Sequence, residues 1–259
     1  MNKEYVLNKL KDQPQYIQEL DDVEEDFKLF IVKNNGNNIK YIKNPSKELQ
    51  IEAIKKNALA VQYIDNINEE VGIISVKALW NSLDLIKNPT DKIIEAAINT
   101  KGWAIQFVHN PSEKLQILAV KKDYDSIKYI NNPSEKVQLE AIGNYYAAIR
   151  FIKNPTLNAK IKAIRLQGEG INYISNYDLD EIKIFIYENI NVVKYIYENI
   201  DISLVTDVLI DKIKEESIDE KYIRDFLDLE ILEMDKINFV REYGSTTAKK
   251  LLVDYKLSM

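Results

Sequence analysis

The residue types that carry out catalysis or bind metals are scarce in this chain. His109 is the only histidine and cysteine is absent, which excludes thiolate sites and sites built from several histidines. Residues 168–170 read Gly-Glu-Gly but lack the Lys-Ser/Thr that completes a phosphate-binding loop, so we expect them to form a turn. Adjacent acidic pairs such as Glu69 and Glu70 do not face one site on a helix. The sequence therefore predicts a non-enzymatic protein without a cofactor or a metal site.

Aromatic and basic residues indicate a different chemistry, the binding of another protein. Tryptophan and tyrosine are frequent anchors of protein interfaces, and here they recur at intervals of roughly 22 residues. We predict a partner-binding set of five aromatic and two basic residues: Trp80, Trp103, Tyr124, Tyr145, Tyr146, Lys128 and Arg150. In the alternative interpretation, each aromatic ring fills a wedge between helix tips.

A strict repeat determines where these residues lie. Asparagine recurs every 22 residues, at positions 44, 66, 88, 110, 132, 154 and 176. A fixed period of this size is the sequence signature of a repeat array. When each repeat is numbered from its asparagine as position 1, the aromatic candidates fall at positions 14–16, between two predicted helices.

The start of each repeat predicts a first helix. Asparagine at position 1 is expected to be the N-cap, proline at position 2 the first helical residue, and glutamate at position 4 part of a capping box. Apolar residues at positions 6, 8, 10 and 11 follow the period of 3.6 residues typical of an amphipathic helix. Position 10 is small in most repeats, which lets a neighbouring helix approach closely.

A second, shorter helix is predicted from apolar residues at positions 18, 20 and 21. Neither helix is long enough to be stable alone, so the repeats must stack and bury a shared core. We predict an all-α fold, a right-handed α-solenoid of stacked two-helix repeats that is similar in architecture to HEAT and TPR arrays.

The repeat also indicates the organisation of the chain. Residues 1–21 are expected to be an N-terminal cap or a degenerate repeat, residues 22–198 eight repeats, and residues 199–259 an acidic helical cap. Within that cap we predict helices at 201–214, 219–240 and 246–257. Because Glu181 stands at the apolar position 6 of its repeat, the first helix of that repeat is expected to be shifted by one residue.

Charge is distributed unevenly along the chain. Residues 44–176 carry 17 basic and 14 acidic groups, whereas residues 177–259 carry 11 basic and 19 acidic groups. No apolar stretch is long enough for a signal peptide or a membrane span, so we expect a soluble protein of the cytoplasm with no membrane partner. The absence of cysteine fits a reducing compartment.

One phrase of the repeat resembles a known type of sequence. Residues 133–142 read Pro-Ser-Glu-Lys-Val-Gln-Leu-Glu-Ala-Ile, and residues 148–152 close the repeat with Ala-Ile-Arg-Phe-Ile. Over about residues 22–197 the pattern is similar to uncharacterised 22-residue α-hairpin solenoid repeats of phages, giant viruses and bacteria. The resemblance implies a phage or mobile-element protein that acts in the host cytoplasm. It also implies an inhibitor, similar to an anti-CRISPR protein, that binds a host defence nuclease or its complex.

Three binding hypotheses follow. The leading one is a protein-binding solenoid that uses the variable positions of the repeat. The alternative is a nucleic-acid-binding solenoid with basic rows at positions 12 and 19, including Lys121, Lys128, Arg150 and Arg165, although the acidic balance of the chain argues against it. In the third, the acidic cap mimics nucleic acid or mediates self-association. The oligomeric state cannot be inferred from the sequence.

Overall fold

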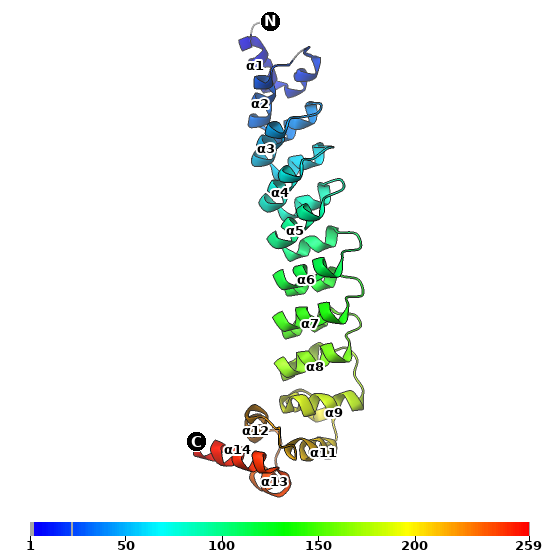
Figure 1. Ribbon diagram of the computed structural model, residues 1–259, viewed down its shortest axis with the longest axis vertical. Helices are drawn as coiled ribbons and strands as arrows, with labels where there is room; N and C mark the ends of the chain where they lie inside the picture. Colours follow the sequence, from blue (N-terminus) through cyan, green and yellow to red (C-terminus); the bar gives the residue numbers. More distant parts are fainter. Residues whose placement is uncertain (1–2, 22, 259) are drawn as a thin grey trace. The chain divides into compact units, whose positions relative to one another are not determined.

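The computed structural model describes residues 3–21 and 23–258, and these residues form helices and connecting turns without a strand (Figure 1). Two compact units divide the chain, an N-terminal unit of residues 1–130 and a C-terminal unit of residues 131–259. In each unit, successive helix pairs pack against the next pair, so the predicted α-solenoid is confirmed.

Each repeat consists of a ten-residue α-helix at positions 4–13 and a six-residue 3-10 helix at positions 15–20. The same lengths and spacing extend into residues 1–21. The helices of the N-terminal unit are α1 (Lys3–Asp12), η1 (Pro14–Glu19), α2 (Glu25–Asn34), η2 (Gly36–Tyr41), α3 (Lys47–Lys56), η3 (Ala58–Tyr63), α4 (Glu69–Ala78), η4 (Trp80–Leu85), α5 (Asp91–Thr100), η5 (Gly102–Phe107), α6 (Glu113–Lys122) and η6 (Tyr124–Tyr129).

The C-terminal unit continues the repeat and then departs from it. Its helices are α7 (Glu135–Asn144), η7 (Tyr146–Phe151), α8 (Leu157–Leu166), η8 (Gly168–Tyr173), α9 (Leu179–Glu188), η9 (Ile190–Val192), α10 (Val193–Ile196), η10 (Tyr197–Asn199), α11 (Ile202–Ile213), α12 (Glu220–Leu227), α13 (Lys236–Tyr243) and α14 (Thr246–Leu257). The helix predicted at 219–240 is therefore two helices. Asp235 caps α13 by accepting a hydrogen bond from the amide of Asn238, and the ammonium of Lys236 donates to the carbonyls of Leu227 and Leu229 at the end of α12.

The predicted N-cap at position 1 is wrong. The capping residue stands at position 3 and is a serine, threonine, asparagine or aspartate, as in Ser112, whose hydroxyl accepts a hydrogen bond from the amide of Leu115. In four repeats the asparagine at position 1 instead adopts a left-handed backbone, with φ of 46° at Asn44 and 49° at Asn110. Asparagine tolerates this region better than most residues, so it forms the turn that leads to the cap.

The second helix is a 3-10 helix, and this changes which of its side chains are buried. With three residues per turn, positions 18 and 21 share one face, positions 17 and 20 a second, and positions 16 and 19 the third. Ile105 at position 18 and Ala104 at position 17 are buried, whereas Gln106 at position 19 is exposed. Position 20 lies at the margin of the core. The α-helical interpretation, which placed this residue on the buried face, is therefore wrong at this position.

Small residues at position 10 allow the α-helix of one repeat to pack closely on the 3-10 helix of the repeat before it. A Cβ atom on Gly102, at position 15, would lie 2.5 Å from the carbonyl oxygen of Ala119 at position 10 of the next repeat. Ser75 occupies the same position as Ala119, and its hydroxyl donates to the carbonyl of Ala58 at 3.0 Å. The role predicted for position 10 therefore has a direct geometric basis.

A glutamine at position 7 links consecutive repeats. The amide nitrogen of Gln138 donates to the carbonyl of Pro133 at 3.0 Å, and its oxygen accepts from the backbone amide of Thr156, in the next repeat, at 3.0 Å. Gln138 is 4 % exposed, so both hydrogen bonds are protected from water. Each glutamine of this kind fixes the turn on which the next α-helix begins.

The repeat with Glu181 keeps its register, and the predicted one-residue shift is wrong. Lys160 replaces the glutamine at position 7 of the preceding repeat, and its ammonium donates to Glu181 at 2.8 Å and to the carbonyl of Asn176 at 2.8 Å. A lysine–glutamate pair thus replaces a glutamine and an apolar residue at the same two positions.

The last helices close the C-terminal unit. Helix α11 packs on α9, and α12 contacts η9 and α14. The buried hydroxyl of Tyr222 on α12 donates to the carbonyl of Ile186 at 2.9 Å, in the last turn of α9, where carbonyls lack helical partners. Burial raises the pKa of this hydroxyl above its usual range.

Candidate binding surface

In each unit, the outward side chains at positions 16, 19 and 20, on the 3-10 helices and in the last repeat on α10, form a surface that we call the 3-10 face. Position 20 is aromatic in nearly every repeat. It reads Tyr41, Tyr63, Leu85, Phe107 and Tyr129 in the N-terminal unit, and Phe151, Tyr173 and Tyr195 in the C-terminal unit. These side chains are half-exposed or exposed, with Tyr63 at 39 % and Tyr195 at 40 %. Sequence reasoning assigned them to the core and so missed them as surface residues.

Trp103 belongs to a cluster on this face in the N-terminal unit, which we call the Trp103 site. Its ring lies edge-on to Tyr129 of the next repeat, with centroids 6.1 Å apart. The indole N–H donates to Oδ1 of Asp125 at 2.7 Å. The ammonium of Lys128 lies 3.8 Å from the centroid of the indole ring and 3.0 Å from Oδ2 of Asp125. Two predicted residues, Trp103 and Lys128, are therefore brought together.

The electrostatics of the Trp103 site are balanced internally. Burial opposes ionisation of Asp125, but the hydrogen bonds from Trp103 and Lys128 outweigh it, so the pKa of this carboxyl lies below its usual value. Lys128 receives both a carboxylate and the face of an aromatic ring, the two groups that stabilise an ammonium best. The cation position in this cluster is occupied by the chain's own lysine.

Tyr146 belongs to a related cluster in the C-terminal unit, which we call the Tyr146 site. Its ring lies 6.1 Å from that of Tyr173 in the next repeat, and its hydroxyl donates to Oε2 of Glu169 at 2.9 Å. The hydroxyl of Tyr173 also approaches Glu169, at 3.5 Å. The hydrogen bond to Glu169, together with burial, raises the pKa of the Tyr146 hydroxyl. Burial, and secondarily the charge of Glu169, raise the pKa of the Tyr195 hydroxyl.

Glu169 is a site residue that sequence reasoning set aside. The expected turn at 168–170 is the first part of η8, with Gly168 and Gly170 buried and Glu169 directed to the 3-10 face. Aligning position 16 across repeats would have found it, because Asp125 occupies the same position in its repeat.

The remaining predicted aromatic residues stand at positions 14 and 15 of their repeats. Trp80 begins η4 and stacks on Phe107 of the next repeat, with centroids 5.9 Å apart. Tyr124 begins η6 and is half-buried. Tyr145 is 40 % exposed and lies 5.0 Å from the ring of Tyr146. The wedge interpretation thus describes Trp80 well, while Tyr145 extends the Tyr146 site towards solvent.

Arg150 lies on an aromatic surface of the C-terminal unit. Its guanidinium carbon is 4.6 Å from the ring centroid of Phe151 and 6.0 Å from that of Tyr173. Arg150 forms no ion pair with any residue that the structure describes. Its charge is therefore placed at the edge of the Tyr146 site without being neutralised by it.

The basic rows proposed for nucleic acid are partly neutralised and lie on different elements. Position 12 is on the α-helices and position 19 on the 3-10 helices. Arg165 at position 12 pairs with Glu188 through two nitrogens, and Lys128 at position 19 pairs with Asp125. Lys121 is exposed near the end of α6. These pairs reduce the positive charge available to a phosphate backbone.

Several acidic residues of the C-terminal helices accept hydrogen bonds at the N-termini of helices. Asp201 and Asp219 cap α11 and α12, and the carboxylate of Glu216 accepts hydrogen bonds from the first amides of α14. Carboxylates at helix N-termini are stabilising, so much of the acidity has a local structural reason.

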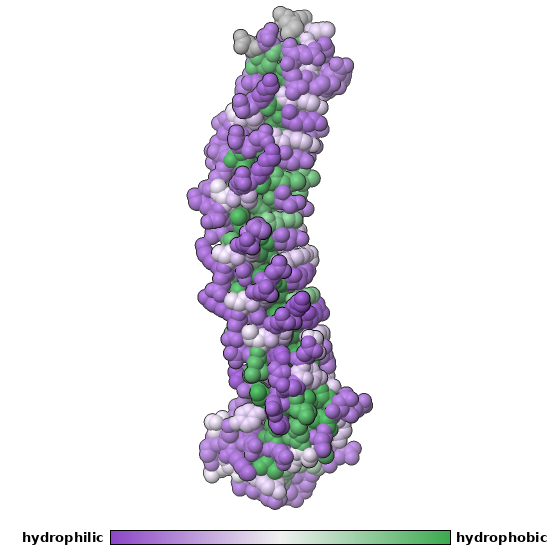
Figure 2. Space-filling view, turned by 90° about the vertical axis from the view of Figure 1, so that its right-hand side faces the viewer, coloured by the Kyte–Doolittle hydropathy of each residue, from purple (hydrophilic) through white to green (hydrophobic). Residues whose placement is uncertain are grey.

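A second set of exposed apolar residues begins three α-helices of the C-terminal unit. Leu157, Leu179 and Ile202 are 42 %, 63 % and 47 % exposed. Polar residues begin the corresponding helices α3 to α6. Figure 2 shows hydrophobic residues gathered at the level of α9 and α11. Because these side chains belong to α-helices and not to positions 16, 19 and 20, they provide control positions for tests of the 3-10 face.

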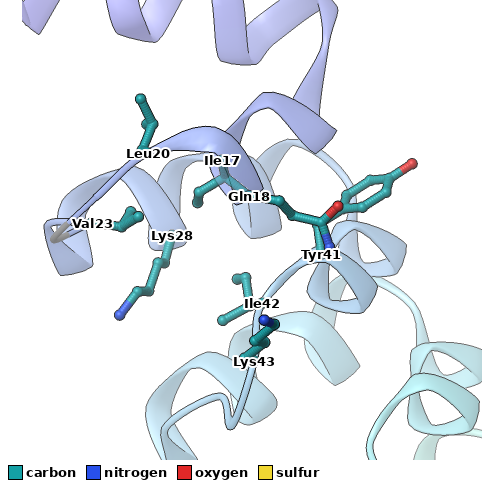
Figure 3. A pocket seen from close by; sticks show the side chains of 8 residues that line it. All are labelled: Ile17, Gln18, Leu20, Val23, Lys28, Tyr41, Ile42 and Lys43. Atoms are coloured by element: carbon teal, nitrogen blue, oxygen red, sulfur yellow. The ribbon is translucent and has the colours of Figure 1, made fainter.

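A depression of about 830 Å³ lies between the ends of η1 and η2 in the N-terminal unit (Figure 3). Half of its described lining residues are aliphatic, Lys28 and Lys43 are the charged groups, and the ring of Tyr41 points away from the other side chains. The described lining offers no carboxylate, histidine or thiol for acid–base or nucleophilic chemistry.

The described helices are at most 12 residues long, and none has the length and apolar character needed to cross a bilayer. In the comparisons with known proteins, no family model, no curated protein and no solved structure matches this chain.

Proposed function

We propose that this protein is a non-enzymatic binding protein that holds a protein partner on its 3-10 face. One observation carries the proposal. Aromatic side chains at position 20 follow each other in successive repeats of each unit and remain partly exposed. Half-exposed Tyr and Trp side chains supply large contact area at low entropic cost, which is why they anchor interfaces.

The residues around this aromatic row support binding to one specific partner. Position 19 changes from repeat to repeat, with Lys40, Asp84, Gln106 and Arg150 among its exposed members. Position 16 varies as well, from Leu59 to Asp125. A constant aromatic row flanked by variable polar groups can provide affinity through the former and specificity through the latter.

The biological setting that we propose rests on the resemblance of the repeat to phage sequences. In this proposal the partner is a host defence protein, such as a nuclease or its complex, and binding blocks its activity. The alternative, a nucleic-acid-binding solenoid, is less well supported because Lys128 and Arg165 are paired with carboxylates.

The proposal is tested by affinity capture from host lysate with the full chain. A triple variant, Tyr41→Ser, Tyr63→Ser and Tyr195→Ser, should lose a protein that the wild type retains, with an unchanged far-UV circular dichroism spectrum. Two matched controls change exposed residues away from the 3-10 face, Tyr5→Ser (58 % exposed) and Leu179→Ser, and should retain the partner.

Two results would contradict the proposal. If the triple variant captures the same protein as the wild type, the 3-10 face is not the binding surface. If the wild type instead retains DNA or RNA, and loses it steeply as salt is raised, the nucleic-acid alternative is correct.

A further inference from the structure

The Trp103 and Tyr146 sites are built on the same frame. In each, an aromatic residue at position 15 or 16 contacts the aromatic residue at position 20 of the next repeat, and both pairs have centroids 6.1 Å apart. In each, the first aromatic residue also donates a hydrogen bond to the carboxylate at position 16 of that next repeat. The repeat thus generates one type of site twice, once in each unit.

The sites differ at three places. The first aromatic residue is Trp103 at position 16 in one and Tyr146 at position 15 in the other, and position 14 is Lys101, whose ammonium lies 4.8 Å from the Trp103 ring centroid, against Tyr145. The third difference is position 19. Lys128 in the Trp103 site contacts the indole face and the carboxylate of Asp125. In the Tyr146 site the corresponding residue is Asn172, which carries no charge. Glu169 accepts hydrogen bonds from Tyr146 and Tyr173 but forms no ion pair within residues 3–21 and 23–258.

The surroundings of Glu169 suit a cation from outside the chain. A carboxylate next to aromatic rings is the arrangement that stabilises an ammonium group most, by ion pairing and by cation–π attraction together. Tyr145, whose ring lies 5.0 Å from that of Tyr146, is 40 % exposed. The site is therefore open to solvent.

We propose that the Tyr146 site binds the ammonium group of a lysine side chain of the protein partner, with Glu169 as the counter-ion and Tyr146 and Tyr173 as the aromatic walls. A lysine is favoured over other cations because Lys128 occupies the equivalent position in the Trp103 site. The inference rests on the proposed function only in that the lysine belongs to the partner.

Arg150 is the internal group that could compete for this site. Its guanidinium lies against Phe151 and at the edge of Tyr173, and it makes no ion pair with Glu169 in the structure. If Arg150 were the true counter-ion of Glu169, the wild type would not bind an external lysine and Arg150→Ala would. That outcome would overturn the proposal.

The experiment uses the full chain with ¹³C-labelled tyrosine rings and a tripeptide, acetyl-Gly-Lys-Gly-amide, added at constant ionic strength. We expect concentration-dependent shifts of the Tyr146 and Tyr173 resonances at millimolar peptide. The same peptide with norleucine in place of lysine keeps the four-carbon chain, lacks the ammonium group and should cause no shift.

Two variants make the test specific. Glu169→Gln keeps the size of the side chain and removes its charge, and should lower the affinity about tenfold, as expected for loss of a charged partner. Asn172→Lys supplies the internal cation found in the Trp103 site and should abolish binding. Arginine in place of lysine should bind more weakly.

The proposal is overturned if lysine causes no tyrosine shift in the wild type, or if Glu169→Gln responds like the wild type. These results are independent of the partner capture experiment. If capture depends on the 3-10 face but the lysine peptide does not bind, the proposed function stands and the lysine site does not. If the peptide binds but the triple variant captures the same protein as the wild type, the lysine site stands and the proposed function does not.

Discussion

The Trp103 site of the N-terminal unit and the Tyr146 site of the C-terminal unit contain the same frame with different occupants. Lys128 completes the first with a charge from its own 3-10 helix, while Asn172 leaves the carboxylate of the second without a basic partner in the described part of the chain. The difference shows how a repeat separates scaffold from binding. Aromatic and acidic residues of neighbouring repeats build both sites, and we infer that position 19, Lys128 in one site and Asn172 in the other, decides whether the site accepts an external cation.

The largest expected effect concerns the packing beneath the Trp103 site. Gly102→Ala should destabilise the protein by about 3 kcal/mol, because the added Cβ would lie 2.5 Å from the carbonyl oxygen of Ala119. Gly143→Ala is the control, since its Cβ would meet only the flexible end of Lys162. Its effect should stay within about 1 kcal/mol and can be stabilising. Chemical denaturation measures both, and equal effects would show that the close approach at Gly102 is not needed.

A smaller effect on the free energy of unfolding is expected when the carboxylate of Asp125 or of Glu169 is removed, and the two losses should differ. Asp125→Ala should cost about 2 kcal/mol of unfolding free energy, since it leaves both the Trp103 indole and the Lys128 ammonium without their partner. Glu169→Ala leaves only tyrosine hydroxyls that water can satisfy, and should cost about 1 kcal/mol or less. The free energies of unfolding of the two variants are measured by chemical denaturation. A larger loss for Glu169→Ala than for Asp125→Ala would contradict the difference that we describe between the two sites.

The contribution of Asp125 should also depend on pH. Its pKa is lower in the folded protein than in the unfolded chain, so its stabilising effect is complete above the unfolded pKa of about 4. The effect is lost as the pH falls through the folded pKa. The difference in unfolding free energy between the wild type and Asp125→Asn should therefore be larger at neutral pH than in acid. A difference that grows on acidification would show that the carboxylate is not stabilised as described.

The smallest expected effect is an increase in the stability of the C-terminal unit. Asn172→Lys should stabilise the C-terminal unit by about 0.5 kcal/mol, because it supplies Glu169 with a cation in partly exposed surroundings. Raising the salt concentration should reduce this gain. Thermal unfolding of the variant and of Asn172→Gln, a neutral control, measures it. A loss of stability relative to Asn172→Gln would mean that the lysine cannot reach Glu169 from position 172.

The repeat period and the all-α class could be predicted from the sequence because backbone geometry requires particular residue types at two places. The Asn-Pro pair marks the turn before each α-helix, and the small residue at position 10 allows the close approach of the neighbouring 3-10 helix. It misassigned the cap, since both the asparagine and the following Ser or Thr favour N-caps and only the left-handed backbone of Asn110 distinguishes them. The α-helical period also placed Tyr63 and its equivalents in the core, because nothing local distinguishes a six-residue 3-10 helix from a short α-helix.

The functional side chains were only partly predictable, for a related reason. Trp103, Lys128 and Tyr146 were found as single residues from their types. Their grouping with Asp125, Glu169 and Tyr173 depends on contacts between neighbouring repeats, which follow only when the repeats are aligned by position. The break near residue 228 was missed because the segment up to Asp235 keeps an amphipathic pattern.

The central claim is that position 19 decides which of the two equivalent sites accepts an external lysine. It is tested most directly by exchanging the two residues in one chain, with Lys128→Asn and Asn172→Lys together, and titrating the lysine tripeptide while observing labelled tyrosine and tryptophan rings. We expect the shifts to leave Tyr146 and Tyr173 and to move to Trp103 and Tyr129. Shifts that persist at Tyr146 and Tyr173, or a Trp103 resonance that does not respond, would contradict it.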